Sequence, residues 1–188
     1  MSTTRLSFIS SFRERANIPS IFKGMDSFKV SVIIPVYNAA KFVRQAVESA
    51  VGLAEVGEII LVDDGYPDDA LKVCQELASS YSTIKLLRHP NGENRGPGAS
   101  RNLGIENSRH EFIAFLDADD WYLPNRYVKD KILFEADPGI DGVYGCTQTA
   151  VDREGTLTFT NEYSTVDGIY SSEQLQLGWL TGSIGAFT

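Results

Sequence analysis

Four short, mostly apolar runs divide the first two thirds of the chain, and segments with apolar residues at helical spacing separate them. Such runs are typical of strands buried on both faces of a parallel sheet. We therefore expect strands at 30–38, 58–62, 84–87 and 112–116, the first ending near Pro35, which lacks an N–H for the sheet. The alternation of strands and helices predicts an α/β fold with a central, mostly parallel sheet flanked by helices.

Two amphipathic helices are expected between the first three strands. Asn38 is a candidate N-cap for the first helix. The residues after it form one apolar stripe, which predicts a helix with a single buried face. The members of this stripe are Phe42, Val43, Ala46, Val47, Ala50 and Val51. The second helix opens at Pro67-Asp68-Asp69, and its stripe consists of Leu71, Cys74, Leu77 and Ala78.

Two further helices are expected on either side of the fourth strand. The stretch 91–98 contains three glycines and a proline, which predicts a loop. A helix over 99–107 follows, with Arg101 in its first turn. Pro124 suits the first position of the last helix, whose stripe we take as Tyr127, Val128, Lys131, Ile132 and Phe134.

The C-terminal part predicts a different arrangement. Segments 143–150 and 157–161 indicate a hairpin with its turn at 152–155. Ser171 and Gln174 have the spacing of a capping box, which predicts a helix to about residue 180 before a further strand.

The first residues of the chain differ from the rest. Residues 1–24 carry a net charge of +3, from four basic residues and Glu14, and Pro19 interrupts any helix there. We expect residues 1–28 to be a poorly ordered extension, with a basic surface-binding arm as the alternative. The folded domain is expected over 29–188.

Composition narrows the class of protein. The chain has 188 residues, 43% of them hydrophobic and 22% charged, which suffices for one domain with a sizeable core. The net charge of −8 argues against general nucleic-acid binding, which needs a basic face.

No apolar run approaches the roughly 18 residues of a membrane span, and the N-terminus lacks a signal-peptide core. We expect a cytoplasmic location and leave peripheral association with the inner face of the membrane open.

Cysteine and histidine suggest no metal centre or disulfide framework. Cys74 and Cys146 are too few and too far apart for either. His89 and His110 are isolated, and we interpret both as structural or surface residues.

Acidic side chains follow two of the expected strands. Asp63 and Asp64 come after the second strand, and Asp117, Asp119 and Asp120 come after the fourth. Parallel strands joined by right-handed crossovers end at one edge of a sheet, so these acids should converge where open α/β sheets bind ligands.

The spacing of Asp117 and Asp119 suggests a metal site. Two carboxylates about 5 Å apart repel by roughly 3 kcal/mol at an effective dielectric near 20, and a divalent cation would relieve that repulsion. Their hard oxygen atoms suit Mg²⁺ or Mn²⁺, although a solvated acidic turn is an alternative. Arg101 should lie near, and carboxylates with a cationic side chain suit a nucleotide diphosphate.

Four motifs in order give the chain a resemblance to a known family. They are Val30-Ser-Val-Ile-Ile-Pro-Val-Tyr-Asn38, Ile60-Leu-Val-Asp-Asp-Gly65, Ala99-Ser-Arg-Asn-Leu-Gly104 and Phe115-Leu-Asp-Ala-Asp-Asp120. Over about residues 29–150 the chain resembles family 2 glycosyltransferases of the GT-A fold, a Rossmann-like fold. The resemblance implies transfer of a sugar, with inversion and with a divalent cation, from a nucleotide-diphosphate-sugar donor. The acceptor would be a hydroxyl of a glycan or a lipid-linked molecule, in polysaccharide or cell-envelope synthesis.

The resemblance also implies roles for individual residues. Pro35 and Tyr37 would flank the nucleotide base, and Asp64, together with Asp63, would bind the base or ribose. The resemblance gives metal binding to Asp117, which also contributes to the nucleotide site, and to Asp119, with Asp120 as a third ligand. Arg101 is similar to the arginine that the family places near the diphosphate.

The chain departs from the family pattern in two places. Tyr66-Pro67 stands where the family usually has a small hydroxyl residue after Asp-Asp-Gly. The family's catalytic base is an acid beyond the hairpin, and no acidic residue follows Glu173, so we expect the base beyond Thr188 and the domain to be incomplete at its C-terminus. Trp121 and Tyr122 have two interpretations, as walls of the sugar or acceptor site or as core residues.

Two alternatives remain open at this point. A signalling receiver domain shares the acidic pair after a strand, although its phosphorylated aspartate should lie about 45 residues on. A nucleotide-sugar-binding protein without catalysis would share the donor site and lack the base.

Overall fold

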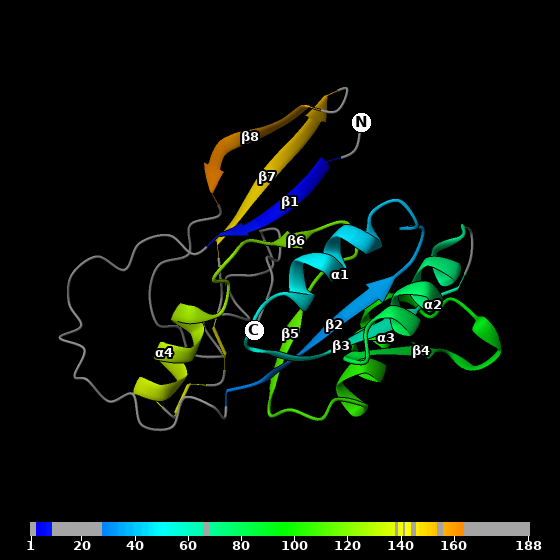
Figure 1. Cartoon of the computed structure of the whole chain (residues 1–188), viewed down its shortest axis with the longest axis horizontal. Coiled ribbons are helices and arrows are strands. Elements are labelled where there is room, and N and C mark those ends of the chain that lie inside the picture. The colour runs from blue at the N-terminus through cyan, green and yellow to red at the C-terminus, as the bar shows by residue number, and fades with distance from the viewer. Residues whose placement is uncertain are drawn as a thin grey trace.

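The computed structural model describes residues 3–8, 28–65, 68–137, 139–140, 142–143, 146–153 and 156–163. These residues form two sheets with helices around one of them (Figure 1). The larger body surrounds a four-stranded sheet of order β4-β3-β2-β5, and the second sheet, of order β6-β1-β7-β8, lies above it in the same view.

The first sheet is parallel throughout and confirms the four predicted strands. Its strands are β2 (Val30–Val36), β3 (Val56–Asp63), β4 (Ile84–Arg88) and β5 (Phe112–Phe115). Ile33 of β2 lies opposite Ile60 of β3 and Phe115 of β5. Burial on both sides explains the near-continuous apolar runs of the two central strands.

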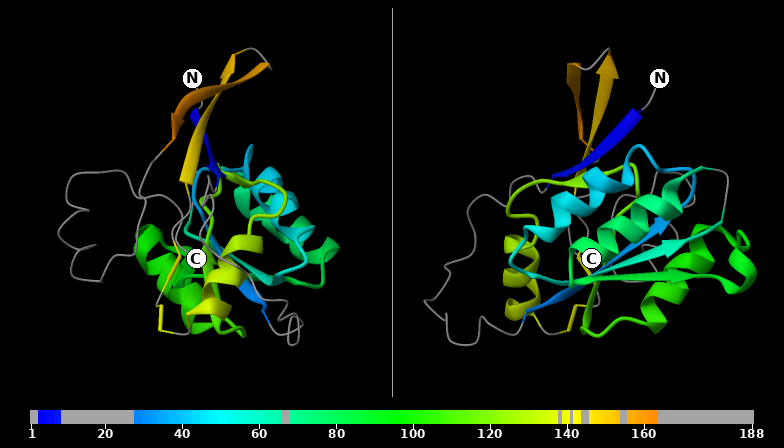
Figure 2. Two further views of the ribbon diagram at one scale, coloured as in Figure 1. Left: turned by 90° about the vertical axis from the view of Figure 1, so that its left-hand side faces the viewer. Right: turned by 45° about the vertical axis from the view of Figure 1, so that its right-hand side comes forward.

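Helices cover both faces of this sheet (Figure 2). Helices α1 (Val43–Val51) and α2 (Ala70–Ser80) pack on one face, against Val32, Ile34, Ile59 and Leu61. Helix α3 (Gly96–Glu106) lies on the other, where Leu103 contacts the cluster of Ile33, Ile60 and Val62. The predicted stripes of α1 and α2 are confirmed in their main members, which are Val43, Ala46, Val47, Ala50, Cys74 and Leu77.

Helix boundaries differ from the predictions in two places. Asn38 is not an N-cap: it has a φ of 51°, and a turn separates it from α1. Helix α3 begins at Gly96, inside the predicted loop, because Pro97 fits the first turn of a helix. A short 3₁₀ helix, η1 (Pro90–Gly92), occupies the start of that loop, and Arg101 lies in the second turn of α3.

The stripe predicted for the last helix is wrong in part. Helix α4 (Val128–Ala136) buries Asp130 and Lys131, whereas Val128 and Ile132 are exposed. Asp130 pairs with the buried guanidinium of Arg126, so an ion pair faces the core where the pattern suggested apolar contacts.

The second sheet contains the predicted hairpin and two strands that the pattern did not indicate. Strands β7 (Cys146–Arg153) and β8 (Thr156–Tyr163) are antiparallel, which confirms the hairpin. Strand β1 (Thr3–Phe8) pairs antiparallel with β7 and parallel with the two-residue β6 (Trp121–Tyr122). Six residues of the expected extension therefore belong to a sheet. The helix expected over 171–180 and the strand after it lie outside the described residues.

A buried carboxylate joins the strands at the edge of the first sheet where they begin. Glu58 is 2% exposed, and its Oε1 accepts hydrogen bonds from Ser31 Oγ (2.7 Å) and Arg109 N (2.6 Å), while Oε2 accepts one from Arg109 Nε (2.9 Å). Burial raises the pKa of Glu58, but these hydrogen bonds and the Arg109 charge outweigh it, so the pKa lies below its ordinary value.

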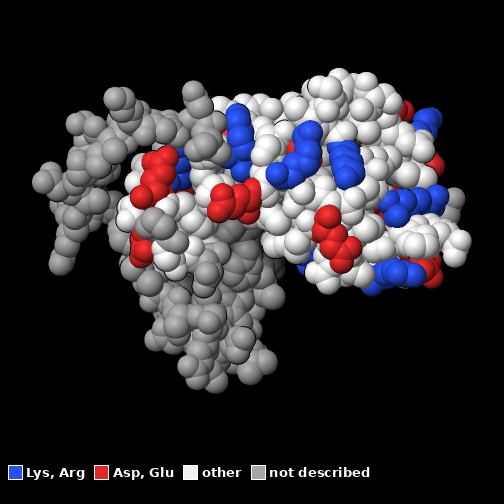
Figure 3. Space-filling model, turned by 90° about the horizontal axis from the view of Figure 1, so that it is seen from below, with Lys and Arg blue, Asp and Glu red and all other residues white. Residues whose placement is uncertain are grey.

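The surface carries charges of both signs. On the face in Figure 3, Lys and Arg side chains are interspersed with Asp and Glu. Among the described helices, none has both the length and the apolar character to cross a membrane.

Candidate functional site

The two acids at the end of β3 point to opposite faces of the sheet. Successive side chains of a strand alternate between its faces. Asp63 therefore follows Ile59 and Leu61 onto the side of α1 and α2, and Asp64 follows Ile60 and Val62 onto the side of α3. The structure thus separates two residues for which we expected a shared role.

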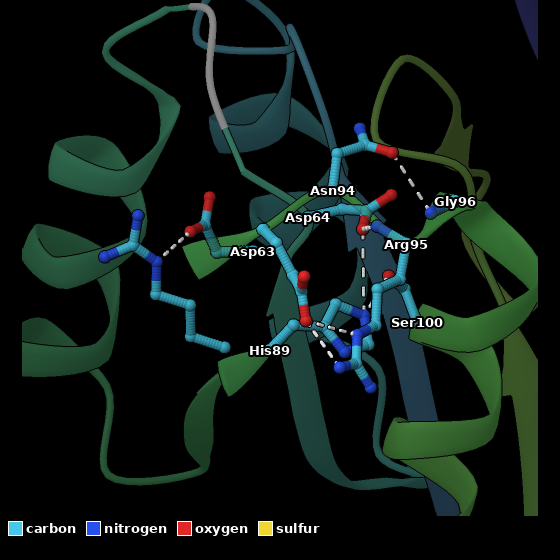
Figure 4. Close-up of polar contacts among 9 residues, drawn as sticks. Asp63, Asp64, His89, Asn94, Arg95, Gly96 and Ser100 are labelled. Atoms are coloured by element: carbon cyan, nitrogen blue, oxygen red, sulfur yellow. Dashed lines mark hydrogen bonds and ion pairs between the residues drawn. The ribbon is translucent and has the colours of Figure 1, made fainter. Parts of the chain in front are cut away.

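Asp64 is the centre of a polar network with the loop between β4 and α3 (Figure 4). Its side chain is 2% exposed, and Oδ1 accepts a 2.7 Å hydrogen bond from Arg95 N. His89 Nε2 lies 3.7 Å from the same oxygen and 2.9 Å from Ser100 Oγ. Oδ2 makes no hydrogen bond within the described part of the chain, so one carboxylate oxygen remains to accept one from a ligand.

Asp63 pairs with Arg88 instead. Arg88 Nε lies 2.8 Å from Asp63 Oδ2 as an ion pair (Figure 4). The guanidinium of Arg88 also lies so close to Gly92 that a Cβ there would overlap it, and Gly92 has a φ of 66°. Asp63 therefore supports the loop that Asp64 holds from the other side, and it is engaged within the fold.

Arg101 joins α3 to the acidic turn after β5. Its Nη2 donates a 2.6 Å hydrogen bond to Asp117 Oδ1, and its guanidinium carbon lies 5.9 Å from the centre of the Phe115 ring. Ser100, the residue before it, takes part in the Asp64 network. Helix α3 thus links the two acidic positions, through Ser100 to the Asp64 network and through Arg101 to Asp117.

The residues from Asp117 to Asp120 form a tight turn, closed by a 3.0 Å hydrogen bond from Asp120 N to Asp117 O. Ala118 is buried, while Asp117 and Asp119 are exposed and Asp120 is half-buried. Within the described residues, no three His, Cys, Asp or Glu side chains are gathered as a complete metal-binding group. The two exposed carboxylates nonetheless fit a hard divalent cation that takes further oxygen ligands from a bound diphosphate.

Pro35 and Tyr37 lie at the end of β2, next to the Asp64 position. Asp64 N donates a 2.9 Å hydrogen bond to the carbonyl of Val36, the residue between them. Tyr37 is 51% exposed and is therefore accessible to a ligand, whereas Pro35 is half-buried.

Two aromatic residues after the acidic turn have separate environments. Tyr122 is 3% exposed, and its hydroxyl donates to Phe115 O while its ring packs edge-on against Tyr127 at 5.6 Å. Burial raises the pKa of Tyr122 to about 12. Core packing is thus the interpretation that holds for Tyr122, while Trp121 remains half-buried.

The sequence pattern missed His89 and Ser100. His89 was interpreted as a structural or surface residue, and it is buried beside Asp64 with Ser100 as its partner. A histidine just after a strand, followed by a serine in the next helix, has no spacing that would reveal the contact. The Tyr66-Pro67 departure lies outside the described residues.

A model of the family described as glycosyl transferase family 2 matches residues 31–184. The chain is similar to the minor teichoic acid biosynthesis protein GgaA of Bacillus subtilis (strain 168), with 39% identity over 102 residues, which is 50% of this chain and 22% of that protein. It is also similar to chondroitin synthase of Escherichia coli, with 31% identity over 160 residues, or 85% of this chain and 22% of that protein. The chain thus spans about a fifth of either relative.

The fold is similar to that of solved glycosyltransferases. One is the mannosyltransferase PcManGT from Pyrobaculum calidifontis in complex with GDP-Man and Mn²⁺, with a TM-score of 0.53 and 22% identity, covering 61% of this chain and 34% of that one. The likeness confirms the predicted GT-A architecture of a parallel sheet flanked by helices and followed by a hairpin. The family match also favours the glycosyltransferase interpretation over a receiver domain.

Proposed function

We propose a glycosyl-transfer function for this chain, which belongs to glycosyl transferase family 2. The observation that carries the proposal is the hydrogen bond between Arg101 and Asp117, since it joins the acidic turn after β5 to the helix that also holds Asp64. A cationic group beside an acidic turn at the carboxyl edge of a parallel sheet suits a nucleotide diphosphate.

The donor is proposed to lie along this edge. Tyr37, exposed at the end of β2, would contact the base, with Pro35 beside it. Asp64 would accept a hydrogen bond from the base or ribose with Oδ2, because Arg95 N already occupies Oδ1. Arg101 would turn from Asp117 toward the diphosphate, to which a guanidinium can donate two parallel hydrogen bonds.

A divalent cation, Mg²⁺ or Mn²⁺, would be held by Asp117 and Asp119, with Asp120 as a further ligand. When bound, it would act as a Lewis acid toward the departing phosphate. Before it binds, Arg101 neutralises Asp117, which limits the repulsion between neighbouring carboxylates. Support for metal use comes from the exposure of the two acids and from the Mn²⁺ in the mannosyltransferase complex.

Transfer would follow direct displacement with inversion. A base would remove the proton of an acceptor hydroxyl, which attacks the anomeric carbon as the nucleotide diphosphate leaves. The acceptor class we favour is a glycan or lipid-linked molecule of the cell envelope, reached from the cytoplasmic side. The likeness to a teichoic acid biosynthesis protein and to a chondroitin synthase supports that class.

Calorimetric titration of the 188-residue chain with a panel of nucleoside diphosphates, with and without Mn²⁺, tests the donor site. Asp119→Ala should abolish the Mn²⁺-dependent part of the affinity. Asp64→Ala should weaken metal-free binding of a nucleoside monophosphate by about 1.5–3 kcal/mol, the loss of one charge-assisted hydrogen bond.

Glu111→Ala provides a matched control, because Glu111 is exposed and directly precedes β5, at the opposite end of the same strand. Its affinities should equal those of the wild type. Equal Mn²⁺-dependent affinity of wild type and Asp119→Ala would contradict the metal site, and an Asp64→Ala affinity within twofold of wild type would contradict the base or ribose contact.

A further inference from the structure

Asp68 joins two loops at the edge where the donor is proposed to bind. Its Oδ2 accepts a 2.7 Å hydrogen bond from Ala40 N, and its Oδ1 accepts a 3.1 Å hydrogen bond from Ala70 N. Ala40 lies in the turn between β2 and α1, and Ala70 is the first residue of α2. One carboxylate therefore holds the turn after β2 against the start of α2, two segments 28 residues apart.

The turn that Asp68 holds carries Tyr37. One end of this turn is fixed by the sheet, because Val36 O accepts the hydrogen bond from Asp64 N. Between these points the chain bends sharply, with Asn38 at a φ of 51°. At the other end of the turn, the hydrogen bond from Ala40 N to Asp68 Oδ2 fixes the backbone. Asp68 thus fixes the backbone three residues after the exposed Tyr37.

We propose that Asp68 is a positioning residue that holds Tyr37 in place for donor binding. This inference rests on the proposed function, since it takes Tyr37 as a wall of the nucleotide site. A carboxylate suits this place because it presents one acceptor oxygen to each of the two N–H donors. An asparagine offers one oxygen and one NH₂ group, so one of the two backbone amides would face a donor instead of an acceptor.

Asp69 provides the matched control for this residue. It is the neighbouring residue at the start of α2, it is exposed, and its side chain makes no capping hydrogen bond. Asp68→Asn and Asp69→Asn each remove one negative charge from the same helix end, so they share any effect of the helix dipole. The two variants differ in the hydrogen bonds that residue 68 accepts from Ala40 N and Ala70 N.

The affinity for a nucleoside diphosphate, measured by calorimetry without metal, should distinguish the variants. We expect the dissociation constant to rise about tenfold in Asp68→Asn, the scale of losing one stacking contact between an aromatic ring and a base, and to stay within twofold in Asp69→Asn. Deuterium exchange over residues 37–42 should become faster in Asp68→Asn and remain unchanged in Asp69→Asn. Asp68→Ser, which keeps one acceptor, replaces Asp68→Asn if that variant does not fold.

A double-mutant cycle with Tyr37→Ala separates positioning from general destabilisation. If Asp68 acts through Tyr37, removing the ring should weaken binding much less in Asp68→Asn than in the wild type. Additive effects, or equal affinities of Asp68→Asn and Asp69→Asn, would overturn the inference and leave the proposed function intact. Absence of nucleotide binding by the wild type would overturn both.

Discussion

Glu58→Gln replaces the buried acid at the far edge of the sheet, and it should cost stability without affecting the donor site. Glu58 accepts three hydrogen bonds, two at Oε1 and one at Oε2. A glutamine that places its oxygen at the Oε1 position keeps the bonds from Ser31 Oγ and Arg109 N as neutral bonds. Its NH₂ group then faces Arg109 Nε, another donor, so the third bond is lost.

The size of the effect follows from these contacts. Hydrogen bonds to an ionised group contribute about 1.5–3 kcal/mol and neutral ones about 0.5–1.5 kcal/mol, so each of the two retained bonds loses about 1 kcal/mol. The lost third bond adds little, because the Arg109 side chain is 67% exposed and can turn to water. We expect the free energy of unfolding to fall by about 2–3 kcal/mol at pH 7.

The pH dependence gives an independent check. The pKa of folded Glu58 lies below its ordinary value of 4.5, so its contribution to stability is complete above about pH 4.5 and is lost as the pH falls through the folded pKa. The difference between wild type and Glu58→Gln should therefore be largest near neutral pH and should narrow below pH 4.5.

Urea unfolding followed by circular dichroism, at pH 7 and at steps down to pH 3, measures both effects. Glu111→Gln is the control, an exposed acid two residues beyond Arg109 that should change stability by less than about 0.5 kcal/mol. A wild-type-like stability of Glu58→Gln at pH 7, or a difference that stays constant on acidification, would refute the reasoning. Nucleotide affinity should be unchanged in the folded variant.

Two predictions address the packing around the site. Gly104→Ala should lower the free energy of unfolding by about 1–3 kcal/mol, because the added methyl group would overlap Ile33. Urea unfolding should show that Gly104→Ala costs less stability in an Ile33→Ala protein than in the wild type. An equal cost in the two proteins would contradict the contact. With Cys146 replaced by serine, Cys74 should resist iodoacetamide at pH 8 until the protein unfolds, because burial, and then the charges of Asp63 and Asp68, raise the pKa of its thiol to about 12; rapid labelling of the folded protein would show that the thiol is accessible.

The strands of the first sheet could be predicted because local sequence determines them. Val30–Val36 and Val56–Asp63 are central strands with helices on both faces, so nearly every position is apolar. The start of α3 was misplaced because Gly96 and Pro97 usually indicate a loop, whereas here they form the first turn of the helix. Local composition alone does not distinguish these two uses of the same residues.

Only the hairpin of the second sheet could be predicted, because the other pairings join segments that are remote in sequence. Strand β1 pairs with β7, in register between Thr3 and Val151 and between Phe8 and Cys146. Neither the six residues of β1 nor the two of β6 form a pattern long enough to indicate a strand.

The buried face of α4 was also predicted wrongly in part. The ion pair between Arg126 and Asp130 places charges where the periodicity suggested apolar residues.

The acidic pair after β3 illustrates how far sequence reasoning could go at the site. Alternation along a strand places Asp63 and Asp64 on opposite faces, and our expectation of a shared role did not take that into account. What the pattern could not supply was the partner of each acid, because Arg88 ends β4 and Arg95 directly precedes α3, at the two ends of the loop that joins them.

The two partners hold opposite ends of one loop, so the two acids fix the same segment from both faces of the sheet. Asp64 Oδ2 accepts no hydrogen bond from a described residue, whereas Asp63 Oδ2 is paired with the Arg88 side chain. For this reason we expect substitutions of Asp63 to act through loop position and substitutions of Asp64 to act on the ligand directly.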